Sequence, residues 1–95
     1  MNVRRYIVSY DICDSKRLRR MEHLIYGFGE RIQLSVYLCD LPDRQFTKMR
    51  HEVQRIINPE VDSVIIVDLG TTSNPRNFVS LGREIQLMSF YTRIT

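Results

Sequence analysis

The sequence predicts a single α+β domain in which two helices cover one face of a β-sheet. Three segments have the apolar patterns of strands, at residues 6–11, 31–41 and 63–69. Between them, two segments repeat apolar residues every three to four positions, as amphipathic helices do. The connections are short and no linker rich in Pro, Gly or Ser divides the chain, so we expect one domain over residues 1–95.

The first strand ends in a carboxylate and leads directly into the first helix. Side chains alternate along a strand, so Asp11 emerges at the strand end, where side chains reach solvent. Asp14 or Ser15 can cap the helix that follows, and Gly27 and Gly29 end it. The apolar stripe of this helix consists of Leu18, Met21, Ile25 and Phe28.

Residues 31–41 form either one long strand or two short strands bent near residues 33–35, and the periodicity does not decide between them. One face of this segment is aliphatic, at Ile32, Leu34, Val36 and Leu38. Pro42 suits the first position of the second helix, Asp43 lies in its first turn, and Asn58 with Pro59 closes it. Its apolar stripe consists of Phe46, Met49, Val53, Ile56 and Ile57.

The last third of the chain contains extended segments. Residues 63–69 are apolar on both faces, which predicts a central strand of the sheet, and residues 70–75 are expected to form a loop. Residues 77–81 are expected to form a further short strand. Residues 85–94 are extended and apolar on both faces, so they need cover. Either a second subunit supplies it through strand addition at a sheet edge, or the segment packs back on its own sheet.

Arginine dominates the positive charge of the chain. Lys and Arg number 14 against 11 acidic residues, a formal net charge of +3, and most of the 14 are Arg, which favours bidentate contact with phosphate. Cys13 and Cys39 have no metal-site spacing and no signal peptide is evident, so we expect reduced thiols in a cytoplasmic protein. The longest apolar run, Val64 to Val67, is too short to cross a bilayer, so no membrane role is expected.

The strongest chemical signal is Asp11 followed by a cluster of cations at the start of the first helix. The cluster consists of Lys16, Arg17, Arg19 and Arg20. A carboxylate beside cations is the arrangement expected where a hard metal ion meets a phosphate backbone. The alternatives are a carboxylate that bonds the start of the helix and a solvated basic helix face. Cations near a helix N-terminus are locally unfavourable, which favours an external anion as their partner.

Other polar residues have simpler expected roles. We expect Asp14 to act as a helix cap and Asp40 to lie in a strand-to-helix turn. His23 and His51 lie on the predicted helices without a nucleophile or base nearby in sequence, so both are expected to be ordinary surface or boundary residues.

Four motifs together resemble the Cas-two family of CRISPR adaptation proteins. They are Tyr10-Asp11-Ile12, Arg31 to Tyr37 followed by Cys39-Asp40-Leu41, Asp62-Ser63-Val64, and Ser80 to Arg83, in this order. The resemblance covers nearly the whole chain. It implies a ferredoxin-like sandwich of βαββαβ order plus a C-terminal strand, residues 85–95, that pairs with the partner subunit of a homodimer. This order favours two strands within residues 31–41.

The resemblance also implies a function. Members of this family are described as Mg²⁺-dependent endonucleases acting on single-stranded RNA or double-stranded DNA, and as the bridge of the CRISPR integrase complex. Asp11 matches the metal-site aspartate, and the other activity-linked positions match Tyr10, Arg20, Arg31 and Tyr37. The expected partners are a second copy of the chain, the integrase subunit, and RNA or DNA backbone bound by the cation cluster. The alternatives are a structural scaffold without catalysis and a generic RNA-binding ferredoxin-like module.

Overall fold

The computed structural model describes residues 2–74, 78–83, 85–86 and 93–94. Within these described residues, four strands and two helices follow the order βαββαβ, and two shorter strands come after them. The elements are β1 (Val3–Asp11), α1 (Ser15–Tyr26), β2 (Glu30–Gln33), β3 (Val36–Pro42), α2 (Asp43–Ile56), β4 (Ser63–Thr71), β5 (Ile85–Gln86) and β6 (Arg93–Ile94).

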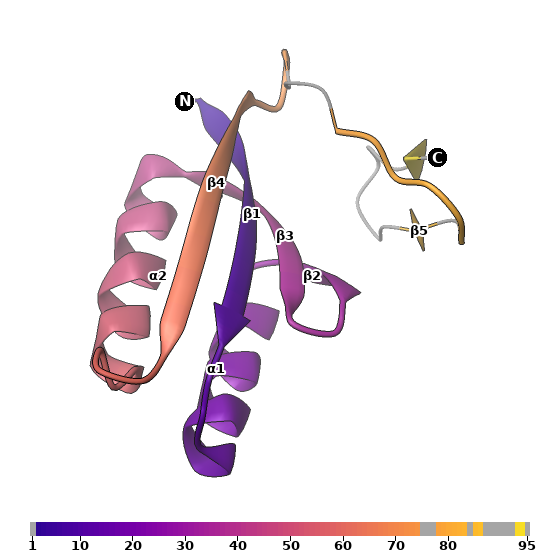
Figure 1. The fold of residues 1–95 in the computed structure, drawn as a ribbon. Coiled ribbons are helices and arrows are strands. Elements are labelled where there is room, and N and C mark those ends of the chain that lie inside the picture. The colour runs from indigo at the N-terminus through magenta and orange to yellow at the C-terminus, as the bar shows by residue number, and fades with distance from the viewer. Residues whose placement is uncertain (1, 75–77, 84, 87–92, 95) are drawn as a thin grey trace.

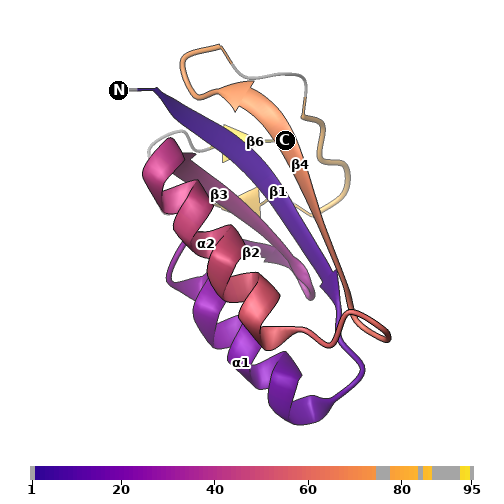
Figure 2. The same ribbon diagram turned by 90° about the vertical axis from the view of Figure 1, so that its left-hand side faces the viewer.

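Strands β1 to β4 form one antiparallel sheet, and both helices cover the same face of it (Figure 1, Figure 2). The strand order across the sheet is β2-β3-β1-β4. The predicted α+β sandwich and its βαββαβ order are therefore confirmed. Residues 31–41 contain two strands, because residues 34–35 form a tight turn between β2 and β3. Leu34 lies on this turn and is 78% exposed, so it does not share a buried face with its aliphatic neighbours.

The helices begin and end close to the predicted residues. The Asp14 carboxylate caps α1 by accepting a hydrogen bond of 2.9 Å from the backbone N–H of Arg17, and this bond lowers the pKa of Asp14. Gly27 ends α1. Helix α2 begins at Asp43, with Pro42 as the residue before it, so Pro42 lies one position earlier than predicted.

The core lies between the two helices and the sheet face that they cover. Its buried side chains are Tyr6, Val8 and Tyr10 of β1, Tyr37, Cys39 and Leu41 of β3, Met21 and Ile25 of α1, and Met49 and Val53 of α2. Tyr6 also stacks on the ring of Phe46, with 4.3 Å between the ring centroids. Burial raises the pKa of the Cys39 thiol to about 12, and neither Cys39 nor Cys13 forms a disulfide.

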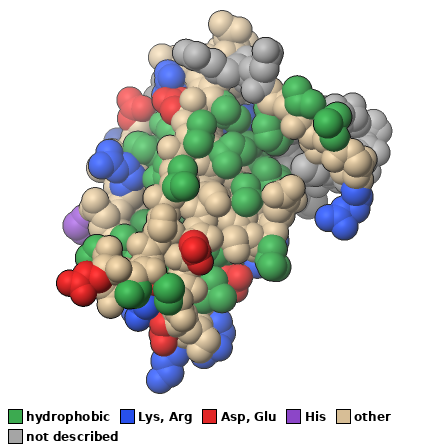
Figure 3. All heavy atoms as spheres, viewed as in Figure 1, with side chains coloured by type: hydrophobic (Ala, Val, Ile, Leu, Met, Phe, Trp, Pro, Cys, Tyr) green, Lys and Arg blue, Asp and Glu red, His purple; other side chains and the backbone are tan. Residues whose placement is uncertain are grey.

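No helix among the described residues covers the opposite face of the sheet, and we call it the open face. Figure 3 shows hydrophobic side chains gathered on it. Ile65 and Val67 of β4 are 59% and 45% exposed there, and Val67 pairs with Ile7 of β1. Residues 78–81 lie against another part of the open face, where they line a cavity of about 260 Å³ with Ile7 and Val36. An exposed apolar surface of this kind is typical of an interaction site.

Several local predictions are wrong. Strand β4 is an edge of the described sheet and not a central strand; its second apolar face is the exposed surface around Ile65. β4 also continues to Thr71, so the loop starts two residues later than expected. Residues 78–81 are not a strand, and residue 77 lies outside the described residues. Asp40 lies within β3 and not in a turn, where Arg5 donates two hydrogen bonds of 2.8 and 2.9 Å to it.

The described C-terminal residues form a separate two-stranded sheet, in which Ile85 pairs with Ile94 and Gln86 with Arg93. Residues 84, 87–92 and 95 lie outside the described residues, so the predicted strand over residues 85–95 and its pairing with a partner stay predictions. Within the described part of the chain, no helix is long and apolar enough to cross a membrane.

Candidate metal site and nucleic-acid interface

Asp11 is the last residue of β1, and its side chain is exposed. Tyr10 before it is buried in the core, so the alternation of the strand directs Asp11 to the open face, where its pairing partner in β4 is Ser63. No described residue forms a hydrogen bond or an ion pair with the Asp11 carboxylate, and Asp14 is the residue that caps α1. The alternative role of Asp11, a hydrogen bond to the start of the helix, therefore has no support among the described residues. The Asp11 carboxylate is available to a ligand.

A buried carboxylate, Asp62, holds the loop that follows Asp11. Its side chain is fully buried and accepts hydrogen bonds from the backbone N–H groups of Cys13, at 2.9 Å, and Asn58, at 2.8 Å. The Arg17 guanidinium donates two more, at 2.7 and 3.2 Å. These bonds, above all those from Arg17, hold the pKa of Asp62 far below its usual range, although burial opposes them. Asp62 thus ties the β1–α1 loop to the α2–β4 loop.

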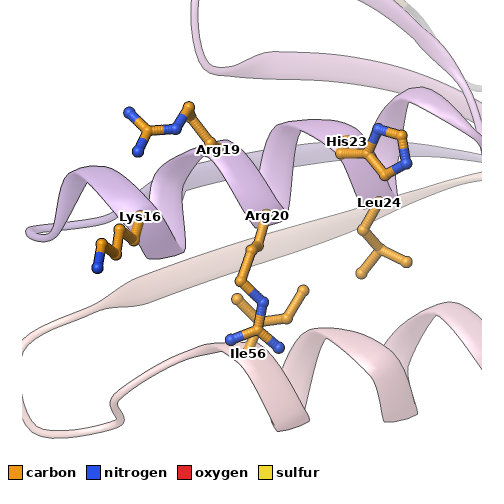
Figure 4. Close-up of a pocket in the computed structure, with 6 residues that line it drawn as sticks. All are labelled: Lys16, Arg19, Arg20, His23, Leu24 and Ile56. Atoms are coloured by element: carbon orange, nitrogen blue, oxygen red, sulfur yellow. The ribbon is translucent and has the colours of Figure 1, made fainter.

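The cation cluster divides into one occupied and three available side chains. Arg17 is bound to Asp62. Lys16, Arg19 and Arg20 are exposed, and none of them has an acidic partner among the residues that the structure describes. These three line a groove between α1 and α2 with a volume of about 560 Å³. The groove is also lined by His23, Leu24 and Ile56, and Figure 4 shows Arg20 reaching from α1 toward Ile56 of α2.

Three of the predicted activity-linked residues form a group on the helix-covered side of the sheet. The rings of Tyr10 and Tyr37 stack with 6.2 Å between their centroids, and the Arg31 guanidinium lies 5.7 Å from the centroid of Tyr37. Arg31 also contacts Glu22 of α1 at 3.4 Å. The Tyr10 hydroxyl is buried and has no hydrogen-bond partner among the described residues, and burial raises the pKa of Tyr10 well above its ordinary value. This phenol therefore stays protonated at neutral pH.

The structure does not bring the five predicted activity-linked residues together within one chain. Asp11 lies on the open face, the Tyr10 group lies on the opposite side of the sheet, and Arg20 lies over the α1–α2 groove. The roles of Tyr10, Arg20, Arg31 and Tyr37 stay predictions. Asp62 and its bonds to the loop were not identified from the sequence as a site feature, because they join residues 45 to 49 positions apart.

Asp11 meets the minimum requirement for binding Mg²⁺. This ion prefers oxygen ligands, keeps several waters, and is often held by one or two carboxylates. No group of three or more His, Cys, Asp or Glu side chains gathers among the described residues. Of the three aspartates Asp11, Asp14 and Asp62, Asp14 caps α1 and Asp62 is buried and bound to Arg17, so Asp11 is the one whose carboxylate is available to such an ion.

Comparison with known proteins places this fold and strand-end aspartate in a family. The sequence profile described as "CRISPR associated protein Cas2" matches residues 4–76. A curated relative, the CRISPR-associated endoribonuclease Cas2 of Geobacter sulfurreducens, is 43% identical over 75 residues, which cover 79% of each chain. This chain belongs to the Cas2 family. The matched residues include Asp11, the cation cluster and Asp62.

Solved structures agree with the assignment to the Cas2 family. The crystal structure of Streptococcus pyogenes Cas2 at pH 6.5 is 31% identical, with a TM-score of 0.65 over 70% of this chain and 86% of that one. A hypothetical protein of Thermus thermophilus, TT1823, is 28% identical, with a TM-score of 0.67 over 92% of both chains. The predicted resemblance to the Cas2 family is thus confirmed.

Proposed function

We propose that this Cas2 protein acts in CRISPR adaptation as a homodimer that binds nucleic-acid backbone and cleaves phosphodiester bonds with Mg²⁺. The single observation that carries the proposal is the Asp11 carboxylate, which is exposed, has no partner among the described residues, and lies on the open face. The relative in Geobacter sulfurreducens is described as an endoribonuclease, which supports a nuclease role.

The open face supports association with a second copy. It exposes Ile65 and Val67 on an edge strand, and a chain of this size has a thin core that gains from added burial. A two-fold interface places the same surface of both subunits in contact. Asp11 lies at one end of this face, so a two-fold axis that runs along the strands would bring the two Asp11 carboxylates to the same end of the dimer.

Asp11 from each subunit would hold Mg²⁺ in this arrangement. When bound, the ion supplies Lewis-acid stabilisation of the phosphate and an activated water. The chain's own contribution is to orient the carboxylate and to bind the substrate. Asp62 fixes the loop after Asp11 through the backbone of Cys13, and Lys16, Arg19 and Arg20 are available for phosphate contacts that do not depend on sequence.

Cleavage assays on short single-stranded RNA and on short duplex DNA test the nuclease role. We expect wild-type protein to cleave at least one substrate with Mg²⁺ and neither with EDTA, and Asp11→Asn to lower the rate by about 100-fold or more. Asp14→Asn is the matched control, because Asn also caps helices and Asp14 lies three residues away on the helix side. Full activity of folded Asp11→Asn would overturn the catalytic role of Asp11.

A second candidate function is that of a scaffold that bridges the CRISPR integrase without cleaving nucleic acid. One observation favours it: the exposed cations Lys16, Arg19 and Arg20 can hold a phosphate backbone without any catalytic group. The scaffold role predicts that spacer acquisition in cells survives Asp11→Asn and is lost when residues 85–95 are deleted. Loss of acquisition in Asp11→Asn, with complex assembly intact, would argue against it.

A further inference from the structure

The groove between α1 and α2 has an apolar floor that phosphate binding does not explain. Leu24 of α1 and Ile56 of α2 are partly buried, and the exposed part of each side chain lies in the groove. A phosphate backbone gains from the cations at the rim and nothing from an aliphatic floor. Figure 4 shows Leu24 and Arg20 extending from α1 toward α2, with the end of the Arg20 side chain beside Ile56.

The lining of the groove also differs from a platform for unpaired bases. Single-stranded nucleic acids bind by stacking their bases on aromatic side chains. Among the described residues that line this groove, the one ring belongs to His23, and the floor is formed by aliphatic side chains. Aliphatic floors between two helices are typical of sites where a third, amphipathic helix docks through residues spaced at i, i+3 and i+4.

The charge of the rim defines the partner further. Lys16, Arg19 and Arg20 stand at the rim, no acidic residue lines the groove, and none of the three cations has an acidic partner among the described residues. A docked segment must therefore carry acidic residues beside its apolar ones. Complementary charge of this kind determines specificity and speeds association.

We propose that the α1–α2 groove docks an acidic amphipathic helix of a partner protein. Aliphatic side chains of that helix pack on Leu24 and Ile56, and its Asp or Glu residues pair with Lys16, Arg19 and Arg20. If the proposed function is correct, these same cations contact nucleic acid, so the acidic helix and the nucleic acid compete for them. Partner binding would then control access of nucleic acid to α1.

The test uses two synthetic helical peptides of about five turns. One places Leu on a single face, flanked by Glu, and the other has the same composition with Leu distributed around the helix. Fluorescence anisotropy is measured on the full-length protein for both peptides and for a short DNA duplex. We expect the amphipathic peptide to bind about tenfold more tightly than the redistributed one, and to displace the duplex. Equal binding of the two peptides would overturn the proposal.

Variants separate the apolar floor from the cations. Ile56→Gln should weaken binding of the amphipathic peptide by about tenfold and leave binding of the duplex unchanged. Arg20→Gln should weaken binding of both. Leu24→Gln repeats the floor test on the other helix. If Ile56→Gln and Leu24→Gln weaken binding of the duplex as much as binding of the peptide, nucleic acid is the occupant of the groove and the proposal is wrong. If the duplex fails to bind while the peptide binds as expected, the proposed function fails and this inference stands.

A footprint on wild-type protein checks the location without any substitution. The chain has two lysines, Lys16 at the rim of the groove and Lys48, which is exposed on α2 outside it. We expect the amphipathic peptide to protect Lys16 from acetylation, detected by mass spectrometry, and to leave Lys48 reactive. Equal protection of both lysines, or of neither, would place the peptide elsewhere and overturn the proposal.

Discussion

The cations of α1 can be distinguished by the salt dependence of DNA binding. Arg17 is bound to the buried carboxylate of Asp62, whereas Lys16, Arg19 and Arg20 have no acidic partner among the described residues. We therefore expect three phosphate contacts from each α1 that touches a duplex, and none from Arg17. Neutralising Arg19 or Arg20 should change the salt dependence, and neutralising Arg17 should not.

The expected size follows from counterion release. Three contacts give a slope of log K against log salt of about −2.7, so affinity falls about 40-fold between about 50 and about 200 mM salt. Arg19→Gln or Arg20→Gln leaves two contacts, a slope of about −1.8 and a fall of about 12-fold. If both subunits of a dimer contact the same duplex, each of these slopes doubles.

Fluorescence anisotropy of a labelled duplex over a salt series measures these slopes. Arg17→Gln is the matched variant, because it removes the same charge from the same helix. Circular dichroism at each salt concentration establishes that the variants stay folded. The reasoning is refuted if Arg17→Gln lowers the slope as much as Arg19→Gln does, or if Arg19→Gln and Arg20→Gln both keep the wild-type slope.

Three further predictions concern the fold. Gly29→Ala would place a Cβ atom 2.5 Å from a backbone carbonyl oxygen of β3 and should destabilise the protein by about 1–3 kcal/mol. In the control Gly27→Ala, the Cβ atom meets its nearest atom at 3.4 Å, so stability should change by less than about 1 kcal/mol. Urea unfolding measures both free energies. The folded-state pKa of Asp62 is depressed, so its stabilisation is present above the unfolded pKa of about 4 and is lost as pH falls below it. Asp62→Asn should therefore flatten the decline in unfolding free energy below about pH 5, and an unchanged pH profile would argue against the bonds to Asp62. Cys39 is buried with its pKa raised to about 12, so at about pH 8 iodoacetamide should modify Cys13 and spare Cys39 in native protein; rapid labelling of both thiols would contradict the core packing.

The sequence was sufficient to predict elements whose patterns are local. The caps and apolar stripes of α1 and α2 lie within single segments, so Asp14, Met21 and Ile25 have the predicted positions. The prediction that β4 is a central strand was wrong, because a strand that is apolar on both faces can be buried in a sheet centre or exposed on an interaction surface. The pattern is the same in both cases.

The candidate site could be predicted only where its residues lie close together in one segment of the sequence. Asp11 and the cations are close in sequence, and so their proximity was expected. The division of the cations could not be predicted, because Arg17 is occupied by Asp62, 45 residues later in the chain. Likewise, strand periodicity says nothing about the bond between Arg5 and Asp40, which depends on the register of β1 against β3.

The central claim is that Asp11 forms half of a site completed by a second subunit. The most direct measurement is metal-dependent cleavage by dimers that are refolded from mixtures of wild-type and Asp11→Asn chains. If both carboxylates are required, an equal mixture should retain about a quarter of the wild-type activity, because about a quarter of random dimers carry two Asp11 residues. Activity that falls in direct proportion to the wild-type fraction, or Asp11→Asn dimers that cleave as fast as wild type, would contradict the shared site.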